Sequence, residues 1–231
     1  MTWGQFYESE RTVITQLGLG EAGTVLDIGC GCGGLGLALR DQFGINRYSG
    51  VEINPQAAEA AERMNPSAQI YQGDFLDLSQ TMLCDTHFDA VFSLSCFDWN
   101  IQFDRMLAAA WKHVVPGGVL VATFRLVSNE GCDDLNQSYQ YINFDGEMEG
   151  ERAAYVVLNA NKLIHKLLAL MPSAIAAFGY FGRPSSTAVT PYEKLCFSAF
   201  SIRKRKDDDQ ALVRFDLNLP EEISSSLELL Q

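Results

Sequence analysis

The chain has 231 residues, 47% of them hydrophobic, with a formal net charge of −12 and a pI near 4.6. This length suits one sizeable α/β domain and is short for two. The acidic balance disfavours a nucleic-acid substrate, because contacts to phosphates need a positive surface. No apolar run is long enough to span a bilayer, and the N-terminal residues lack the basic and apolar regions of a signal peptide. We therefore expect a cytoplasmic protein without a membrane partner.

Aromatic residues stand at helical spacing near the N-terminus. Trp3, Phe6 and Tyr7 precede Glu10 and Arg11, and this pattern predicts an amphipathic helix. Its aromatic side could pack into the core or cover a ligand pocket, and the spacing fits both interpretations.

A glycine-rich turn follows the first predicted strand, residues 24–28. Asp27, Gly29, Gly31 and Gly33 form the pattern D-x-G-x-G-x-G, and a helical pattern starts at Leu35. Glycines allow positive φ and let a ligand approach the backbone, while the N–H groups of the next helix face that ligand. A phosphate-binding P-loop does not fit, because no Gly-Lys-Ser/Thr follows. The spacing also satisfies the dinucleotide fingerprint, so the turn alone leaves two ligand classes open.

The second predicted strand, residues 48–53, contains Glu52, about 20 residues beyond the turn, where an acid can accept the hydroxyl groups of a ribose. Asn54 and Pro55 then predict the N-cap and first residue of a helix that extends to Met64. The third predicted strand ends in Gly73-Asp74-Phe75.

Two further strands follow. The fourth strand is predicted at residues 88–95. The fifth is predicted at residues 119–124, after a helix over 107–115 and the turn Pro116-Gly117-Gly118. These five landmarks, over residues 20–126, resemble the class I S-adenosylmethionine-dependent methyltransferases. The resemblance implies S-adenosyl-L-methionine as cofactor, with Asp74 at the adenine amino group and the Phe75 ring against adenine. The residues it implies for cofactor binding are Asp27, Gly29, Gly31, Gly33, Glu52, Ile53, Asp74, Phe75, Ser93 and Tyr7.

The resemblance also implies an architecture. We expect an α/β fold: a doubly wound, mostly parallel sheet of seven strands in the order 3-2-1-4-5-7-6, with helices on both faces and an antiparallel last pair. That pair is predicted at residues 176–182 and 194–202, after a helix over 155–170. We expect one methyltransferase domain over residues 1–206. Residues 207–231 form a C-terminal extension of unknown role, with a possible strand at 213–217.

Residues 127–152 change the character of the sequence. They combine acids with Tyr139, Tyr141 and Phe144, which is too aromatic for a plain linker. Insertions at the carboxyl ends of strands often cover a ligand, so we expect a lid over the substrate. An ordinary surface excursion with solvated acids is the alternative. Farther on, the basic run 203–206 precedes the acids 207–209, which suggests local neutralisation.

The catalytic residues are less defined. Asp98 follows the fourth strand and is a candidate proton acceptor or substrate anchor, although it could instead cap the next helix. His165, on the helix predicted at 155–170, could face the pocket. No metal is expected, because the six cysteines show no zinc-type spacing.

These observations predict a methyltransferase that acts on an O or N atom of a small molecule, such as a sugar or secondary metabolite. A protein or peptide methyltransferase and a non-catalytic cofactor-binding subunit are the alternatives. An aminopropyl transferase shares the fold, but the run 93–98 lacks its paired acids. The Asn/Asp-Pro-Pro-Tyr/Phe motif of enzymes that act on DNA bases is also absent. The sequence does not define an oligomeric state.

Overall fold

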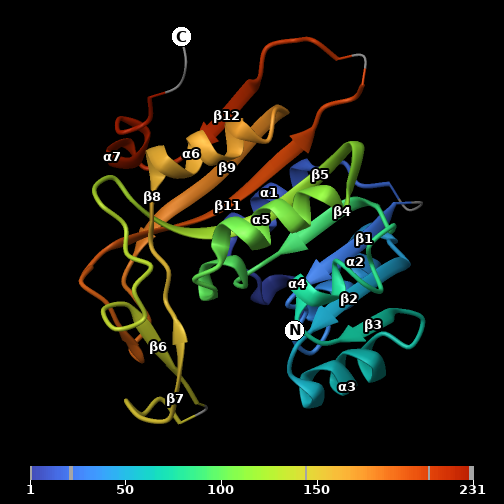
Figure 1. The fold of residues 1–231 in the computed structure, drawn as a ribbon, viewed down its shortest axis with the longest axis horizontal. Coiled ribbons are helices and arrows are strands. Elements are labelled where there is room, and N and C mark those ends of the chain that lie inside the picture. Colours follow the sequence, from blue (N-terminus) through green and yellow to red (C-terminus); the bar gives the residue numbers. More distant parts are fainter. Residues whose placement is uncertain (1, 21–22, 144, 208, 229–231) are drawn as a thin grey trace.

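A single twisted sheet organises the protein (Figure 1). The computed structural model describes residues 2–20, 23–143, 145–207 and 209–228. Within these residues the main path of the sheet runs β12-β9-β11-β5-β4-β1-β2-β3. The bounds are β1 (Thr24–Ile28), β2 (Arg47–Glu52), β3 (Gln69–Gln72), β4 (Phe88–Ser93), β5 (Val114–Val127), β9 (Pro172–Gly182), β11 (Leu195–Lys204) and β12 (Arg214–Asn218).

The predicted strand order is confirmed, with β9 as the sixth strand and β11 as the seventh. Strands β3, β2, β1, β4 and β5 pair in parallel, and β11 pairs antiparallel with both β5 and β9. The described sheet is wider than the seven strands expected. Strand β12 adds in parallel to β9, and the short β8 (Leu158–Asn159) pairs with the end of β5.

Helices cover both faces of the sheet, as a doubly wound fold requires. Neighbouring residues of one strand belong to different hydrophobic clusters. Leu26 shares its cluster with residues of α4 to α7, and Val25 shares its cluster with residues of α1 and α2. No helix in the described ranges is long and apolar enough to cross a membrane. The helices are η1 (Trp3–Gln5), α1 (Glu8–Gln16), α2 (Gly34–Phe43), α3 (Pro55–Met64), α4 (Phe75–Leu78), η2 (Phe97–Trp99), α5 (Phe103–Lys112), α6 (Ala160–Ala169) and α7 (Glu221–Ser224).

Helix α3 begins as predicted. The side chain of Asn54 accepts hydrogen bonds from the backbone N–H groups of Gln56 and Ala57, at 3.0 and 3.1 Å, and Pro55 occupies the first turn. These bonds satisfy donors that have no partner inside the helix.

The helix predicted over 155–170 is shorter than expected. It begins at Ala160, where the side chain of Asn159 accepts from the N–H of Lys162. Residues 155–157 are consecutive and all buried, and one face of a helix cannot bury three residues in a row. They are instead extended between the sheet and the segment before them. Cys132 and Val157 exchange backbone hydrogen bonds there.

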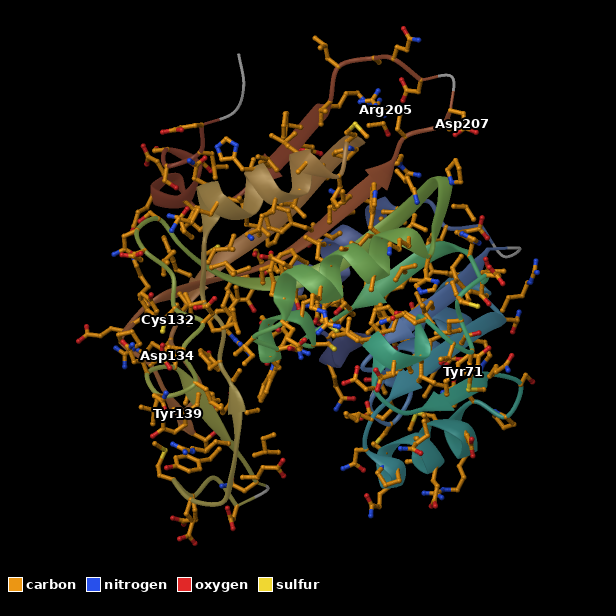
Figure 2. The ribbon with its side chains drawn as sticks, viewed as in Figure 1. Tyr71, Cys132, Asp134, Tyr139, Arg205 and Asp207 are labelled. Atoms are coloured by element: carbon orange, nitrogen blue, oxygen red, sulfur yellow. The ribbon has the colours of Figure 1, made fainter. Side chains whose placement is uncertain are left out.

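Residues 127–152 contain regular structure. Strands β6 (Tyr139–Ile142) and β7 (Glu151–Ala154) form an antiparallel hairpin, to which β10 (Ala188–Val189) adds. We call these three strands the flap. It extends beyond the end of the sheet where β5 finishes. Tyr139 lies on the flap, and Cys132 and Asp134 lie on the segment that leads to it (Figures 1 and 2). Phe144 lies outside the described residues, and the lid role stays a prediction.

The C-terminal residues pack onto the same sheet. The strand predicted at 213–217 is present as β12, and Ile223 of α7 is fully buried in the core that contains α5 and α6. Arg205 forms an ion pair with Asp209 at 3.5 Å, in line with the local neutralisation predicted for this stretch. Arg205 and Asp207 mark this region in Figure 2.

We predict that Ile223→Ala lowers the free energy of unfolding by about 2–4 kcal/mol, because it leaves a cavity in the shared core. The matched control is Ile142→Ala in the flap, where the side chain is exposed, with an expected change within about 0.5 kcal/mol. Urea unfolding of both variants measures this. Equal stability of Ile223→Ala and the parent chain would show that the tail contributes nothing to the core.

Candidate active site

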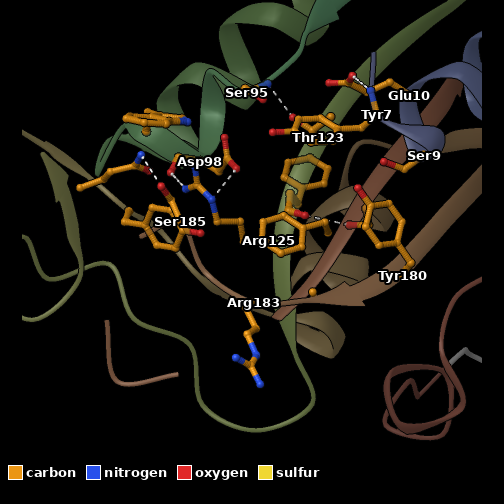
Figure 3. A pocket seen from close by; sticks show the side chains of 17 residues that line it. Tyr7, Ser9, Glu10, Ser95, Asp98, Thr123, Arg125, Tyr180, Arg183 and Ser185 are labelled. Atoms are coloured by element: carbon orange, nitrogen blue, oxygen red, sulfur yellow. Dashed lines mark hydrogen bonds and ion pairs between the residues drawn. The ribbon is translucent and has the colours of Figure 1, made fainter. Parts of the chain in front are cut away.

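Two adjoining cavities lie at the carboxyl ends of the parallel strands, where open α/β sheets bind ligands. The first, about 510 Å³, lies against the glycine turn and is called the turn cavity. The second, about 470 Å³, is lined by aromatic side chains of β5, β9, β11 and neighbouring segments and is called the aromatic cavity (Figure 3). Tyr7, Glu10 and Ser95 line both cavities.

The glycine turn presents bare backbone to the turn cavity. Gly31 has φ +54°, and a Cβ at this position would meet nothing within 4 Å, so it would project into open space. Gly33 has a different reason to be glycine. A Cβ there would collide with Asn65, whose side-chain N–H donates to the carbonyl oxygen of Gly33 at 2.9 Å. Gly31 is therefore the position where the backbone can meet a ligand, and Gly33 fixes the turn against α3.

Glu52 joins the glycine turn to the end of β2 through hydrogen bonds. Its two carboxylate oxygens accept hydrogen bonds from the backbone N–H groups of Gly31, at 2.8 Å, and Asn54, at 2.9 Å. A carboxylate offers about four acceptor positions, so capacity remains for hydroxyl groups. The neighbouring Ile53 is exposed and is free to cover a ligand.

Asp27 is a buried acid at the end of β1. Its side chain is 3% exposed, lines the turn cavity and accepts a hydrogen bond from the hydroxyl of Tyr48 at 2.7 Å. Burial raises the pKa of Asp27 to about 7, against the opposing effect of the Tyr48 hydrogen bond.

The other predicted cofactor residues differ in their exposure to solvent. Asp74 is exposed and caps α4, accepting from the N–H of Leu76. Phe75 is buried in the core, with its ring edge-on to His113 at 5.8 Å. The predicted contact of the Phe75 ring with adenine therefore does not fit this structure, because α4 turns that side chain inward. Ser93 is fully buried, and Leu94 and Ser95 after it line the turn cavity.

Asp98 lies deep in the aromatic cavity and is 4% exposed. Its carboxylate is 3.4 Å from Nε of Arg125, and its backbone carbonyl accepts from Nη1 of Arg125 at 2.7 Å. The guanidinium also stacks on the ring of Tyr155, 3.7 Å from its centroid. Burial raises the pKa of Asp98, and the charge of Arg125 opposes this shift. Asp98 is not the N-cap of the next helix, since α5 begins at Phe103.

Glu10 is the residue that the sequence interpretation missed. It lies on α1 at the junction of the two cavities, is 4% exposed, and accepts a hydrogen bond from the backbone N–H of Tyr7 at 2.8 Å. Burial raises the pKa of Glu10 to about 7. A signal was present: Glu10 shares a helical face with the buried Val13 and Ile14, and an acid on such a face is unusual.

Ser95 marks the junction from the side of the sheet. It adopts φ 49°, which is uncommon for a residue other than glycine, and its N–H donates to Oγ1 of Thr123 at 2.6 Å. Such strained positions concentrate at functional sites.

The histidines stay outside the two cavities. His165 is exposed on α6 and lines neither of them, because α6 turns Leu163, Ile164 and Leu167 toward the core. His113 is structural: its Nδ1 lies 2.8 Å from the carbonyl of Thr86, and burial lowers its pKa. The described residues contain no group of three or more side chains suited to a metal ion.

Comparison with known proteins agrees with this geometry. Residues 26–120 match a family model described as a methyltransferase domain. This part of the chain is therefore similar to methyltransferase domains. Among solved structures, the chain resembles in fold a Haemonchus contortus phosphoethanolamine N-methyltransferase 2, with TM-score 0.59, 14% identity, and 88% of this chain and 53% of that chain covered. It also resembles the glycopeptide N-methyltransferase MtfA bound to S-adenosyl-L-homocysteine, with TM-score 0.51, 16% identity, and 83% and 88% covered.

The curated relatives of this chain differ in substrate. A trans-aconitate 2-methyltransferase of Deinococcus radiodurans is 32% identical over 97 residues, covering 42% of this chain and 35% of the relative. A dTDP-3-amino-3,6-dideoxy-alpha-D-glucopyranose N,N-dimethyltransferase of Streptomyces fradiae is 31% identical over 105 residues, covering 44% and 39%. This chain thus spans less than half of the length of either relative.

A third relative corrects one expectation. A ribosomal RNA small subunit methyltransferase C of Pseudomonas aeruginosa is 28% identical over 131 residues, covering 54% of this chain and 38% of that protein. Because a methyltransferase that acts on RNA is among the relatives, the net charge of this chain does not exclude a nucleic-acid substrate.

We predict that Glu10 makes the stability of this protein depend on pH. Its pKa rises from 4.5 to about 7 on folding, so the folded state holds the proton more tightly. The resulting stabilisation is complete below pH 4.5 and is lost as the pH rises to about 7, by about 3 kcal/mol in total. Glu10→Gln should remove this loss. Urea unfolding at pH 4.5, 6 and 8 measures it, and identical pH profiles for the variant and the parent chain would contradict it.

Proposed function

We propose that this protein transfers a methyl group from S-adenosyl-L-methionine to an O or N atom of a small molecule. The observation that carries the proposal is the pair of cavities joined at Tyr7, Glu10 and Ser95. One cavity borders the glycine turn, and the other contains polar groups and aromatic walls. Donor and acceptor must meet for an in-line displacement, and a junction between two cavities allows this.

The residues in and beside the turn cavity suit this cofactor. Gly31 offers backbone that a ligand can approach, and Asp27 offers a buried carboxylate for the methionine end. Glu52, which accepts a hydrogen bond from the N–H of Gly31, has acceptor capacity left for ribose hydroxyls. Asp74 lies at the end of β3, where the resemblance puts the adenine amino group. When bound, the cofactor supplies an electrophilic methyl group on a sulfonium ion.

The aromatic cavity suits a small acceptor. At about 470 Å³ its volume lies in the range of small-molecule sites. Its aromatic side chains exclude water, and Asp98 with Arg125 offers fixed polar groups to orient a substrate. The protein's free cysteines, which include Cys30 in the turn, suit a reducing compartment, so we also propose that it works in the cytoplasm.

One assay tests the proposal against its alternatives. The protein is incubated with S-adenosyl-L-methionine labelled in the methyl group, together with small-molecule, protein and RNA fractions of a cell extract. Label in small molecules supports the proposal. Label in protein or in RNA would assign the acceptor to a macromolecule, and no label in any fraction would favour a non-catalytic cofactor-binding subunit.

We predict that Glu52→Ala weakens binding of S-adenosyl-L-homocysteine by about 1–3 kcal/mol, because ribose hydroxyls lose a charged acceptor. Glu52→Gln keeps the shape and one acceptor oxygen and should lose less. Gly31→Val should lose more, since its side chain would enter the turn cavity at a positive φ. Titration calorimetry of the three variants measures this, with a nicotinamide dinucleotide as the ligand expected not to bind. Unchanged affinity in Glu52→Ala would contradict the assignment of Glu52.

We further predict that residues 127–152 and 3–7 exchange amide hydrogens more slowly when cofactor and acceptor are bound. Displacement at carbon benefits from exclusion of water, yet the acceptor must enter and leave, so a covering segment has to move. Gln140 of the flap and Tyr7 already line the aromatic cavity. Hydrogen exchange with and without ligands measures the change. Strong, unchanged protection of both segments in all states would rule out a lid.

A further inference from the structure

Three buried carboxyl groups follow the path from one cavity to the other. Asp27 lines the turn cavity, Glu10 lies at the junction, and Asp98 lines the aromatic cavity. Their exposed fractions are only 3%, 4% and 4%. Burial is the largest cause of the raised pKa of each. Neighbouring charges raise two of these pKa values further: Glu52 and then Glu10 raise that of Asp27, and Asp98 raises that of Glu10. Each of these groups would gain from a cation bound beside it.

The positive side chains of the aromatic cavity do not balance the negative charge of these acids. Arg125 is held by Asp98 through both its carboxylate and its backbone carbonyl, and its guanidinium stacks on Tyr155. Arg183 is exposed, and its side chain points away from Asp98 and Arg125 (Figure 3). The inner part of the cavity therefore contains two acids and one cation.

A second, independent observation points to a ligand. Oδ1 of Asp98 is buried and has no hydrogen-bond partner within the described part of the chain, and the same holds for Nε1 of Trp99. Both residues line the aromatic cavity. A buried polar atom without a partner is costly. A ligand that donates to Asp98 and accepts from Trp99 would satisfy both atoms.

We propose that the methyl acceptor in the aromatic cavity is an amine, which Asp98 binds as the ammonium ion and from which Glu10 removes a proton. This inference rests on the function proposed above. The proton passes from nitrogen to a carboxylate oxygen of Glu10, and the freed lone pair forms the new N–C bond. The C–S bond of the donor breaks, and its electron pair stays on sulfur as a neutral thioether. Glu10 then releases the proton to solvent.

Proton affinities favour an amine over other acceptors. An alkyl ammonium resembles lysine, with a pKa of about 10.4, about three units above the pKa of about 7 of Glu10. An alcohol, whose proton is held about as tightly as that of water, lies about nine units above Glu10. A phenol has a suitable pKa, but its anion would form beside Asp98 and Glu10. A carboxylate would bring a third negative charge to the same place.

The other groups that face Glu10 do not take over its role. The backbone N–H of Tyr7 fixes one of its oxygens. The charge of Asp98 raises the pKa of Glu10, and the charge of Glu10 in turn raises the pKa of Asp27. Tyr180 of β9 has a pKa raised by burial and by Glu10, so its hydroxyl stays protonated and neutral near pH 7. Glu10 is the acid at the junction that both cavities share.

Calorimetry with two cofactor analogues tests the role of Glu10. Sinefungin carries an amine where the donor carries its methyl group, whereas S-adenosyl-L-homocysteine carries no charge there. The parent chain should bind sinefungin more tightly than S-adenosyl-L-homocysteine at pH 8. Glu10→Gln should reduce that ratio about tenfold, as loss of one charge-assisted hydrogen bond predicts. Glu8→Gln is the matched control, because Glu8 is exposed on the same helix, and its ratio should equal that of the parent chain.

Three matched acceptor probes test the substrate class on protein saturated with S-adenosyl-L-homocysteine. Benzylamine should bind more tightly than benzyl alcohol and benzoate, and Asp98→Asn should remove the preference. Equal binding of the three probes, tighter binding of benzoate, or an unchanged sinefungin ratio in Glu10→Gln would overturn the inference. The proposed function fails separately, if neither cofactor analogue binds the parent chain.

Discussion

The buried ion pair of Asp98 and Arg125 holds together the segments that form the aromatic cavity. The backbone carbonyl of Asp98 accepts from Arg125 of β5 and also from the N–H of Val156, at the base of the flap. Tyr155, next to Val156, packs on the other face of the guanidinium. Loss of either charge would leave its partner uncompensated, at a cost of about 3–5 kcal/mol. The pair therefore fixes where the flap begins relative to the sheet, and it leaves one buried oxygen of Asp98 without a hydrogen-bond partner among the described residues.

Burial of carboxyl groups in this site lowers the stability of the fold and favours the binding of a cation or a proton. Water would stabilise the ionised carboxylates of Asp27, Glu10 and Asp98, and burial removes that water. Their raised pKa values express the free-energy cost of ionising them in the site. The same cost makes them strong partners for a cation or a proton. Tyr48 and the amide of Tyr7 compensate part of it through hydrogen bonds. Groups with such perturbed pKa values concentrate at functional sites.

The resemblance to a known family predicted the strand order, which the structure confirms. The cap at Asn54 and the glycine turn at Gly31 follow from residues that are neighbours in the sequence. The misses need long-range contacts. Phe75 is turned inward by α4, and Arg125 meets Asp98 only because β4 and β5 are adjacent in the sheet. Glu10 reaches the junction because α1 packs on β9 and β11, and no spacing near Glu10 encodes that packing.

The place of the N-terminal segment depends on contacts of large sequence separation. Helix α1 contacts β9 and β11, which lie more than 150 residues farther along the chain, and these contacts hold Tyr7 and Glu10 at the junction. Contacts of such large sequence separation are costly in loop entropy. A ligand that bridges the two cavities would contact Tyr7, Glu10 and Ser95 together and would stabilise the arrangement by mass action. Such a ligand would therefore favour the placement of α1 on which the junction depends.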